Sequence, residues 1–427
     1  MLVEEQENVK RVQLSNKYLK EATLGDANED AIKSGNFYDW SSLPEHLFDQ
    51  VFGNLETVKQ CLQFSGVCKC WHSVAKDNQR KLVELSFHNV PMLLVPNKHK
   101  EDDNKDEWSV YDVLSDKFLI SNLLLPPYDH SFGGSSQGWL LTLDDNLSLT
   151  LYKPFVGISI NDVIHLPPIS STPMDKGLLE GIAKYRQYYV MKMSIHTPDP
   201  IANPKDLIIA VIFGQYKLAY IRPLKQLTWS QIDIQSPFDD LVYHKNKFYA
   251  ITLTSQLASF DVDNNVNFFA DSTIPDDDYD CYEPVVGRSS CYKRYLVESL
   301  GGDLLHVKRY ERYTRAFYNC VTIKFKIYKW SSEKWIEIKS IGDSALFLGD
   351  NTSVCVLASN FVGCEKDSIY FIDDKDTIDY AHKGQMDLGV YNIQTRVCSR
   401  RGFNFDAATI PKTRGRQPIW VLPTLSI

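Results

Sequence analysis

Two periodicities of apolar positions divide the chain into a short helical part and a long part built from strands. Residues 39–76 place apolar side chains at the three- and four-residue spacing of amphipathic helices. Ser41 and Ser42 offer capping oxygens before the first helix, and Pro44 suits a first helical turn. The pattern predicts three short helices, whose apolar positions are Leu47, Phe48, Val51, Phe52 and Leu55, then Val58, Cys61 and Leu62, and then Val67, Cys68, Trp71, Val74 and Ala75.

Beyond residue 85 the pattern becomes that of short strands. One unit recurs, in which an apolar strand, a tight turn and a second strand follow each other, beginning near Val110, Leu151, Tyr220, Ser259, Ile327 and Val390. Some copies are close to forty residues apart, and others leave room for inserted loops or an unrecognised unit. Groups of about four strands at such a period are typical of a β-propeller, and six or seven blades would fit. A β-sandwich is the rival, but six hairpins exceed what one sandwich usually holds.

The two ends of the strand region are themselves apolar strands. "VPMLLVP" lies near residue 93, and "IWVLP" lies near residue 420. Placing both in one blade would close a ring and remove exposed sheet edges. We therefore predict an α+β multidomain chain with a polar and flexible extension over 1–36, a small three-helix module over 37–84, and an all-β domain over 85–427.

Cys68, Cys70 and His72 stand at every second position and raise the question of a metal site. Successive helical residues turn by about 100°, so Cys68 and Cys70 would point about 200° apart. Cys68 and His72 share a face, but two ligands fall short of the four that structural zinc takes. We interpret Cys68 as a core residue and Cys70 as a surface residue, and we expect no metal and no cofactor.

Composition narrows the classes of partner. The formal net charge is −8, which argues against a nucleic-acid-binding protein because phosphate contacts need a basic surface. The N-terminal residues lack the apolar core of a signal peptide, and the longest apolar runs are too short to span a membrane. The nine cysteines show no framework spacing. We therefore expect a reducing compartment, the cytoplasm or the nucleus or both, and no membrane partner.

The sequence holds one motif of an enzyme. "GSSQG", residues 134–138, matches the nucleophile elbow of hydrolases, but that motif needs a strand before it and a helix after it. Here prolines and a glycine pair precede it and the strand "WLLTL" follows, so we interpret Ser136 as a turn residue. Phosphate-loop, H-E-x-x-H and EF-hand motifs do not occur, so we expect a protein without catalytic residues.

The helical module resembles an F-box. Leu43-Pro44, then Leu47, Val51 and Leu55, and finally "VCKCW" from Val67 to Trp71 follow the F-box pattern, although "KCWHSV" departs from the usual residues at Cys70 and His72. The remainder resembles the KIB/SKIP-type group of plant F-box proteins, whose C-terminal domain of unknown function is thought to be a β-propeller. The matching pieces are "GGSSQGWLLTLDDNLSLTLYKPFVG", "FDDLVYHKNKFYAIT" and "PIWVLPTL".

The resemblance implies a function. An F-box binds a Skp-type adaptor and through it a cullin, while the C-terminal domain holds the protein to be ubiquitinated. The F-box core and adaptor surface would comprise Leu43, Pro44, Leu47, Val51, Leu55, Val67, Cys68 and Trp71. One alternative is an interaction protein that sequesters or inhibits its partner without degrading it. Another is a propeller enzyme for a small molecule, which a buried cluster of titratable groups in the propeller channel would favour.

One acidic stretch is a candidate for partner binding. Asp271 to Pro284 carries six carboxylates and no basic residue. Binding groups concentrate on long loops, so we predict that Asp276, Asp277, Asp278, Tyr279, Asp280 and Tyr282 help to recruit a protein presenting Lys or Arg. The alternative is an acidic loop that only keeps the surface soluble.

Overall fold

The structure is a computed structural model, and it describes the helical module and the strands with gaps between them. The described residues are 44–55, 64, 67–78, 90–96, 107–124, 131–144, 147–152, 163–169, 189–196, 206–214, 216–223, 225, 228–232, 236–261, 266–269, 289–314, 319–372, 387–399, 403 and 418–422. The predicted extension 1–36 and the predicted second helix lie outside them. None of the helices formed by these residues is long and apolar enough to cross a membrane.

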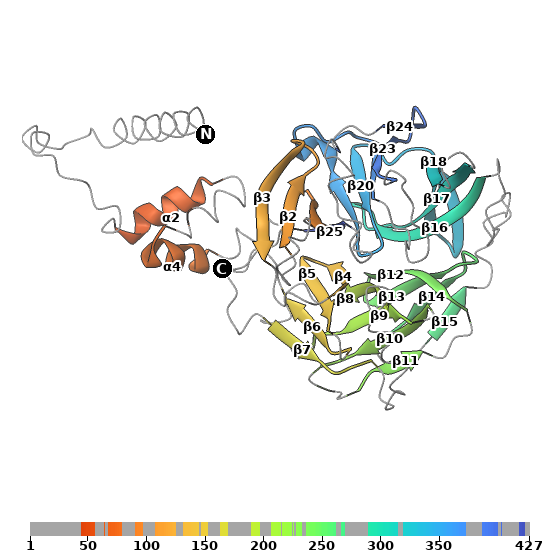
Figure 1. The fold of residues 1–427 in the computed structure, drawn as a ribbon, viewed down its shortest axis with the longest axis horizontal. Coiled ribbons are helices and arrows are strands. Elements are labelled where there is room, and N and C mark those ends of the chain that lie inside the picture. Colours follow the sequence, from red (N-terminus) through yellow and green to blue (C-terminus); the bar gives the residue numbers. More distant parts are fainter. Residues whose placement is uncertain are drawn as a thin grey trace, which may run out of the picture.

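Two α-helices of the N-terminal module lie within the described residues. Helix α2 spans Glu45–Gly53 and begins after Pro44, and α4 spans Lys69–Asp77. Helix α4 starts later than its apolar pattern suggests, because Cys68 has extended backbone angles (φ −161°, ψ 175°) and serves as the N-cap residue. Figure 1 shows the two helices packed on each other as a unit separate from the strands.

Twenty-five strands form six sheets, which follow one another around a ring in chain order (Figure 1). We call them blades 1 to 6. Blade 1 holds β25 (Ile419–Val421), β1 (Met92–Pro96), β2 (Glu107–Asp112) and β3 (Lys117–Leu124); blade 2 holds β4 (Ser131–Ser136), β5 (Trp139–Leu143), β6 (Leu149–Tyr152) and β7 (Val163–Leu166); blade 3 holds β8 (Val190–Ile195), β9 (Ile209–Phe213), β10 (Lys217–Ile221) and β11 (Ser230–Ile232).

The second half of the ring has the longer strands. Blade 4 holds β12 (Phe238–His244), β13 (Lys247–Thr252), β14 (Leu257–Phe260) and β15 (Val266–Phe269); blade 5 holds β16 (Ser289–Glu298), β17 (Leu304–Thr314), β18 (Asn319–Ser331) and β19 (Lys334–Ile338); blade 6 holds β20 (Ser344–Leu348), β21 (Ser353–Leu357), β22 (Ser368–Phe371), β23 (Gly389–Asn392) and β24 (Val397–Ser399), with the 3₁₀ turn η6 (Ala358–Asn360) after β21. The domain is therefore a six-bladed β-propeller, and the rival sandwich is excluded.

Each of the six hairpins predicted from the sequence corresponds to the two outer strands of one blade, but near Leu151 and Tyr220 connections of ten and eight residues stand where a tight turn was predicted. The hairpin near Val110 is β2–β3, and the one near Val390 is β23–β24. The other four are β6–β7, β10–β11, β14–β15 and β18–β19. The interval that left room for an unrecognised unit contains β8 and β9, the inner strands of blade 3, so no seventh unit is needed.

The ring closes as the sequence predicts. Strand β25, from the C-terminal end, pairs antiparallel with β1 and places Trp420 opposite Leu93. The buried Trp420 indole also donates a hydrogen bond to the carbonyl of Leu348 in blade 6 (3.0 Å). Blade 1 thus joins both ends of the strand region in one sheet, with β25 as its edge strand.

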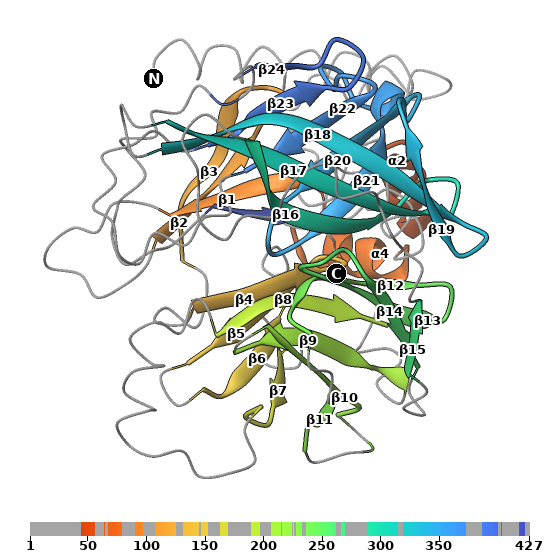
Figure 2. The same cartoon turned by 90° about the vertical axis from the view of Figure 1, so that its right-hand side faces the viewer.

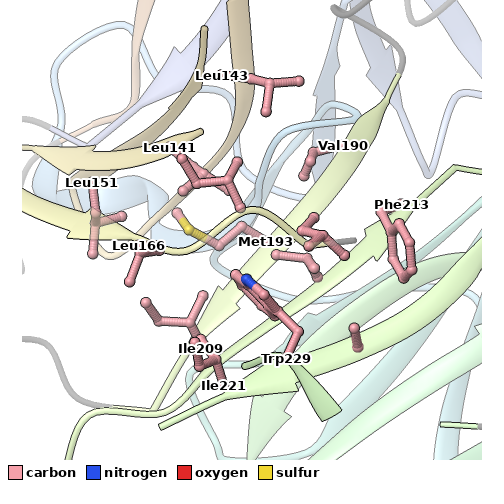
Figure 3. Packing of buried hydrophobic residues seen from close by; sticks show 14 of the residues in the cluster. Leu141, Leu143, Leu151, Leu166, Val190, Met193, Ile209, Phe213, Ile221 and Trp229 are labelled. Carbon is pink, nitrogen blue, oxygen red and sulfur yellow. The ribbon is translucent and has the colours of Figure 1, made fainter. Parts of the chain in front are cut away.

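Apolar side chains between neighbouring blades form the core. Figure 3 shows the cluster between blades 2 and 3, where Leu141, Leu151, Met193, Ile209 and Trp229 pack together. Every residue of β5 and β9 is buried, because each blade is covered on both faces. Blades 2 and 3 approach closely at Gly134 (φ 155°), where a Cβ atom would lie 2.9 Å from the backbone nitrogen of Met193.

Blade 6 departs from the four-stranded pattern. It has five strands in the order β21-β20-β22-β23-β24, and β20 and β22 run parallel. The inner end of the sheet is β21, which contacts β16, the inner strand of blade 5. The hairpin β20–β21 thereby adds a strand on the channel side of the ring.

A buried arginine joins blades 5 and 6. Arg309, on β17, is fully buried and pairs with the carboxylate of Asp387 (Nη2 to Oδ2, 3.0 Å). It also donates to Thr322 Oγ1 (2.8 Å) and to the carbonyl of Ile372 (2.8 Å). Asp387, two residues before β23 of blade 6, also accepts a hydrogen bond from the backbone nitrogen of Thr322 on β18 (2.9 Å). This bond holds β18 of blade 5 to blade 6.

Candidate functional site

The first candidate site is the surface of the helical module, and aromatic side chains hold its two helices together. Phe48 and Phe52 of α2 are buried, as are Phe64, Val74 and Ala75. The ring of Trp71 lies 4.4 Å from that of Phe64 and 5.3 Å from that of Phe48, centroid to centroid. Asn78 donates to Asp49 Oδ1 (2.9 Å) and so links the end of α4 to α2.

Apolar side chains are left partly exposed on this module. Leu47 and Val51 of α2 and Leu55, two residues after its end, recur every four residues and are all half-buried. Val67, just before α4, is 56% exposed. These partly exposed apolar side chains are groups that a protein partner can cover.

The predicted F-box residues fall into three groups. Leu47, Val51, Leu55 and Trp71 pack against the buried core while keeping part of their surface exposed. Pro44 and Val67 are exposed, so Val67 is available for direct contact rather than for interior packing. Leu43 lies outside the described residues. The buried Phe64 was not predicted, because it stands alone between the helical patterns.

The cysteines of the module do not converge. Cys68 is half-buried at the start of α4, and Cys70 is exposed. His72 is also exposed, and its backbone nitrogen donates to the Cys68 carbonyl (2.9 Å) in the first backbone hydrogen bond of α4. Among the described residues, no group of three or more His, Cys, Asp or Glu side chains is arranged to hold a metal ion.

The second candidate site is the channel of the propeller, where charged side chains from the inner strands meet. Lys192 of β8 pairs with Asp240 of β12 (Nζ to Oδ1, 2.8 Å), and both are almost fully buried. Lys192 also donates to Ser353 Oγ of β21 (3.3 Å). The ion pair therefore joins blades 3 and 4, and the hydrogen bond to Ser353 joins blade 3 to blade 6.

A second ion-pair group lies beside the first. Asp239 pairs with Lys293 (3.2 Å) and accepts from the backbone nitrogen of Arg294 (3.0 Å), both on β16. Lys293 also pairs with Asp350 in the turn between β20 and β21 (2.7 Å). The carbonyl of Asn351, in the same turn, accepts from the backbone nitrogen of Ser135 of blade 2 (3.2 Å). We call these residues and the Lys192–Asp240 pair the channel cluster.

Asp240 shows the role of the cluster. Burial raises the pKa of its carboxyl, and the nearby Lys192 ammonium opposes that shift. The carboxylate also accepts from the backbone nitrogens of Leu241 (2.7 Å) and Leu296 (2.8 Å). Its lone pairs are thus directed at fixed protein donors, and this arrangement ties blades together instead of presenting a base to a substrate.

The hydrolase-like motif has no catalytic geometry. Ser136 ends β4, and Gln137 and Gly138 form a tight turn into β5, so no helix follows the serine. Its hydroxyl accepts from the backbone nitrogen of Ile195 in blade 3 (3.2 Å). The prediction that Ser136 is a turn residue is wrong by one position, because Ser136 is the last residue of β4 and the turn is formed by Gln137 and Gly138.

The acidic stretch predicted to recruit a basic partner lies outside the described residues. It belongs to the connection between Phe269, the last residue of β15, and Ser289, the first residue of β16. Asp276, Asp277, Asp278, Tyr279, Asp280 and Tyr282 therefore remain a prediction.

Comparison with known proteins agrees with both parts of the structure. Residues 110–392 match the family model of the KIB1-4 beta-propeller, and residues 40–82 match an F-box-like model. The chain is similar to the Arabidopsis thaliana F-box protein SKIP23, at 24% identity over 84% of this chain and 90% of the relative. It is also similar to the probable F-box protein At4g22165 of the same plant, at 25% identity over 92% of this chain and 99% of the relative.

Among solved structures, the bacterial surface component PorZ of Porphyromonas gingivalis aligns at 12% identity with a TM-score of 0.30, over 70% of this chain and 30% of that chain. The assignment depends instead on the family match, which covers blades 2 to 5, blade 6 without β24, and β3 with part of β2 in blade 1. Since a helical module that matches the F-box-like model precedes the propeller, the chain belongs to the KIB1-4 β-propeller family of F-box proteins.

Proposed function

We propose that this protein is the substrate-recognition subunit of a Skp-cullin-F-box ubiquitin ligase. The observation that carries the proposal is the joining of an F-box-like module with partly exposed apolar residues to a complete six-bladed propeller. Leu47, Val51, Leu55 and Val67 contact the Skp-type adaptor, which links the chain to a cullin. The propeller holds the target protein, and the ligase acts in the cytoplasm, the nucleus or both.

The protein itself is not a catalyst in this proposal. A buried cluster of titratable groups does occur in the propeller channel, which is the feature that would favour an enzyme. Its carboxylates, however, are paired with lysines, an arginine and backbone nitrogens of neighbouring blades. The turn between β20 and β21 also contacts both Lys293 of blade 5 and Ser135 of blade 2, so its polar groups likewise join blades. The channel cluster therefore supports a binding scaffold.

The adaptor contact can be tested with two single substitutions. Val67→Asp places a charge in the apolar contact surface and should weaken adaptor binding by the full chain about tenfold or more. Ser73→Asp is the matched control, because Ser73 is exposed on α4 and adds the same charge outside the apolar contact surface. Equal adaptor affinity of the two variants in a titration would contradict the proposed contact.

A second experiment separates a ligase subunit from a protein that only sequesters its partner. Affinity purification of the intact chain, beside a chain lacking residues 39–84, identifies proteins held by the propeller. For a ligase subunit, the half-life of such a partner should lengthen in cells that carry the shortened chain or a proteasome inhibitor. An unchanged half-life in both conditions would favour the non-degradative alternative.

A further inference from the structure

The contact between blades 4 and 5, which we call the seam, has a small apolar core. Figure 2 shows the strands of blade 5, in teal, beside those of blade 4, in green. The buried apolar residues described in the seam are Ile251 and Leu257 of blade 4 with Leu296 and Leu304 of blade 5. Each of the other five contacts between neighbouring blades has at least seven such residues in the described part of the chain. Local opening is easiest where few apolar groups are buried, so we expect it at the seam.

Two carboxylates of β12 hold the channel side of the seam. Asp239 pairs with Arg294 (3.4 Å) and Lys293 (3.2 Å) of β16. Asp240 accepts a hydrogen bond from the backbone nitrogen of Leu296 on the same strand (2.8 Å). Because these contacts join the inner strands of the two blades, an opening of the seam has to begin among the outer strands.

A histidine without a hydrogen-bond partner lies further out in the seam. His306 of β17 stands directly opposite Leu296 and therefore faces blade 4. Its side chain is fully buried, and its ring lies 5.1 Å from that of Trp335 and 5.8 Å from that of Tyr328, centroid to centroid. Neither ring nitrogen has a hydrogen-bond partner among the described residues. A charge on this ring would be buried without compensation, which costs far more than burying the neutral ring.

The charged groups around His306 do not provide a counter-ion. From blade 5, the titratable groups on the seam side are Arg294, Glu298, Lys308, Tyr310, Lys324, Lys326, Tyr328 and Glu337. From blade 4, they are Asp240, His244, Lys247, Tyr249 and Asp261. Three of the carboxylates have other cationic partners: Glu298 lies 3.4 Å from His244, Glu337 pairs with Lys339, and Asp240 pairs with Lys192.

We propose that the outer part of the seam is a proton-sensitive joint, which opens about the contacts of Asp239 and Asp240 when His306 takes up a proton. In the closed seam, the neutral imidazole packs on Trp335 and Tyr328 as an apolar ring would. In the open seam, water solvates the imidazolium. Opening changes the surface that two adjacent blades present to a partner. This device is a property of the ring and does not depend on the proposed ligase function.

The direction of the pH effect follows from the environment of His306. Burial lowers its pKa well below the usual value, and Lys308 and Arg294 lower it further. In the open seam the exposed imidazole binds a proton as the pH falls below about 6.5, whereas in the closed seam it does not. The equilibrium constant for opening should therefore rise about eightfold between pH 7 and pH 5.5.

Amide hydrogen exchange of the full chain, corrected for the intrinsic pH dependence of exchange, measures this opening. Protection in β14, β15, β18 and β19 should fall about eightfold between pH 7 and pH 5.5, and the exchange there should not depend on urea below the unfolding transition, as is typical of local opening. Protection in β7 and β11, the outer strands of blades 2 and 3, should stay constant. An equal loss in β7 and β11, or a urea dependence at the seam as steep as that of global unfolding, would overturn the proposal.

Two further measurements show whether His306 is the group that responds. His306→Phe should abolish the pH-dependent loss at the seam, whereas His165→Phe, at an exposed position of β7, should retain it. A loss that persists in His306→Phe would contradict the proposal. In the wild type, which requires no variant to fold, the nuclear magnetic resonance signals of the His306 ring should remain those of a neutral imidazole down to pH 5.5. Titration of His306 near pH 6.5 in the folded chain would equally overturn it.

Discussion

At the scale of single residues, the propeller keeps polar groups buried at the junctions between blades. Lys192, Asp240, Arg309 and Asp387 are all found there, and each is held by partners from a neighbouring blade. His306 of β17 is different. It is fully buried beside Tyr328 and Trp335, and neither of its ring nitrogens has a hydrogen-bond partner among the described residues.

Stability should therefore depend on His306 at mildly acidic pH. Burial lowers its pKa well below the usual value, and the nearby Lys308 and Arg294 lower it further. The unfolded chain takes up a proton near pH 6.5 while the folded chain does not, so this contribution destabilises the fold as the pH falls below about 6.5. His306→Phe should remove up to about 1.4 kcal/mol of that loss per pH unit in chemical unfolding.

The exposed His165 of β7 provides the control for this experiment. His165→Phe should leave the pH dependence as it is in the wild type. If His306→Phe and the wild type lose the same free energy of unfolding between pH 7 and pH 5, His306 does not carry the effect.

Breaking the channel pair should cost more than breaking a surface pair. Lys192→Met leaves the Asp240 carboxylate buried without its counter-ion, which typically destabilises a protein by about 3–5 kcal/mol. Lys334→Met, at an exposed position of β19, should change the free energy of unfolding by less than about 0.5 kcal/mol. Denaturant titration of the two variants measures both values. Equal midpoints would mean that the channel pair does not hold the ring together.

At the scale of elements, the sequence predicts the outer strands of the blades better than the inner ones. In four of the six outer hairpins a short turn joins the two strands, and that pattern depends only on neighbouring residues. Strand β21 could not be predicted as an extra inner strand, because its position depends on pairing with β20 and on contact with β16. The channel cluster left only a weak signal in the sequence, a charged residue inside an apolar strand such as Lys192 in "VMKMSI".

Substitutions just before α2 can test the helical module without altering the propeller. Leu43→Ala with Pro44→Ala should weaken adaptor binding and leave the propeller folded, because the two residues precede α2 and the blades have their own core. Trp71→Ala should be at least as damaging to binding. It removes ring contacts with Phe48 and Phe64, and deleting a buried aromatic side chain costs about 3–5 kcal/mol, so part of its effect would be unfolding of the module.

The two effects are distinguishable by one pair of measurements, adaptor co-purification and the thermal unfolding of the propeller. The double variant should lose the adaptor at an unchanged propeller transition. Full retention of the adaptor by the double variant would contradict the assignment of Leu43 and Pro44 to the F-box surface.

At the scale of the whole molecule, the ring is closed by distant segments and held by charge. Trp420 stands opposite Leu93 in the sheet of blade 1 and donates a hydrogen bond to the carbonyl of Leu348 in blade 6. The turn between β20 and β21 contacts residues of blades 2 and 5. A rigid closed ring leaves recognition to its surface loops, where sequence can vary without disturbing the core. The acidic stretch belongs to one of these connections, the one between β15 and β16, and its role stays a prediction.

Association kinetics should test whether the acidic stretch helps to recruit a basic partner. For a basic partner recovered by affinity purification, changing Asp276, Asp277 and Asp278 to Asn should slow association most at low salt, because exposed charges raise association rates and salt screens them. Thermal stability should change little in the Asn variant. If the association rate at low salt is the same for the wild type and the Asn variant, the acidic stretch is only a solvated insertion and the partner binds elsewhere on the propeller.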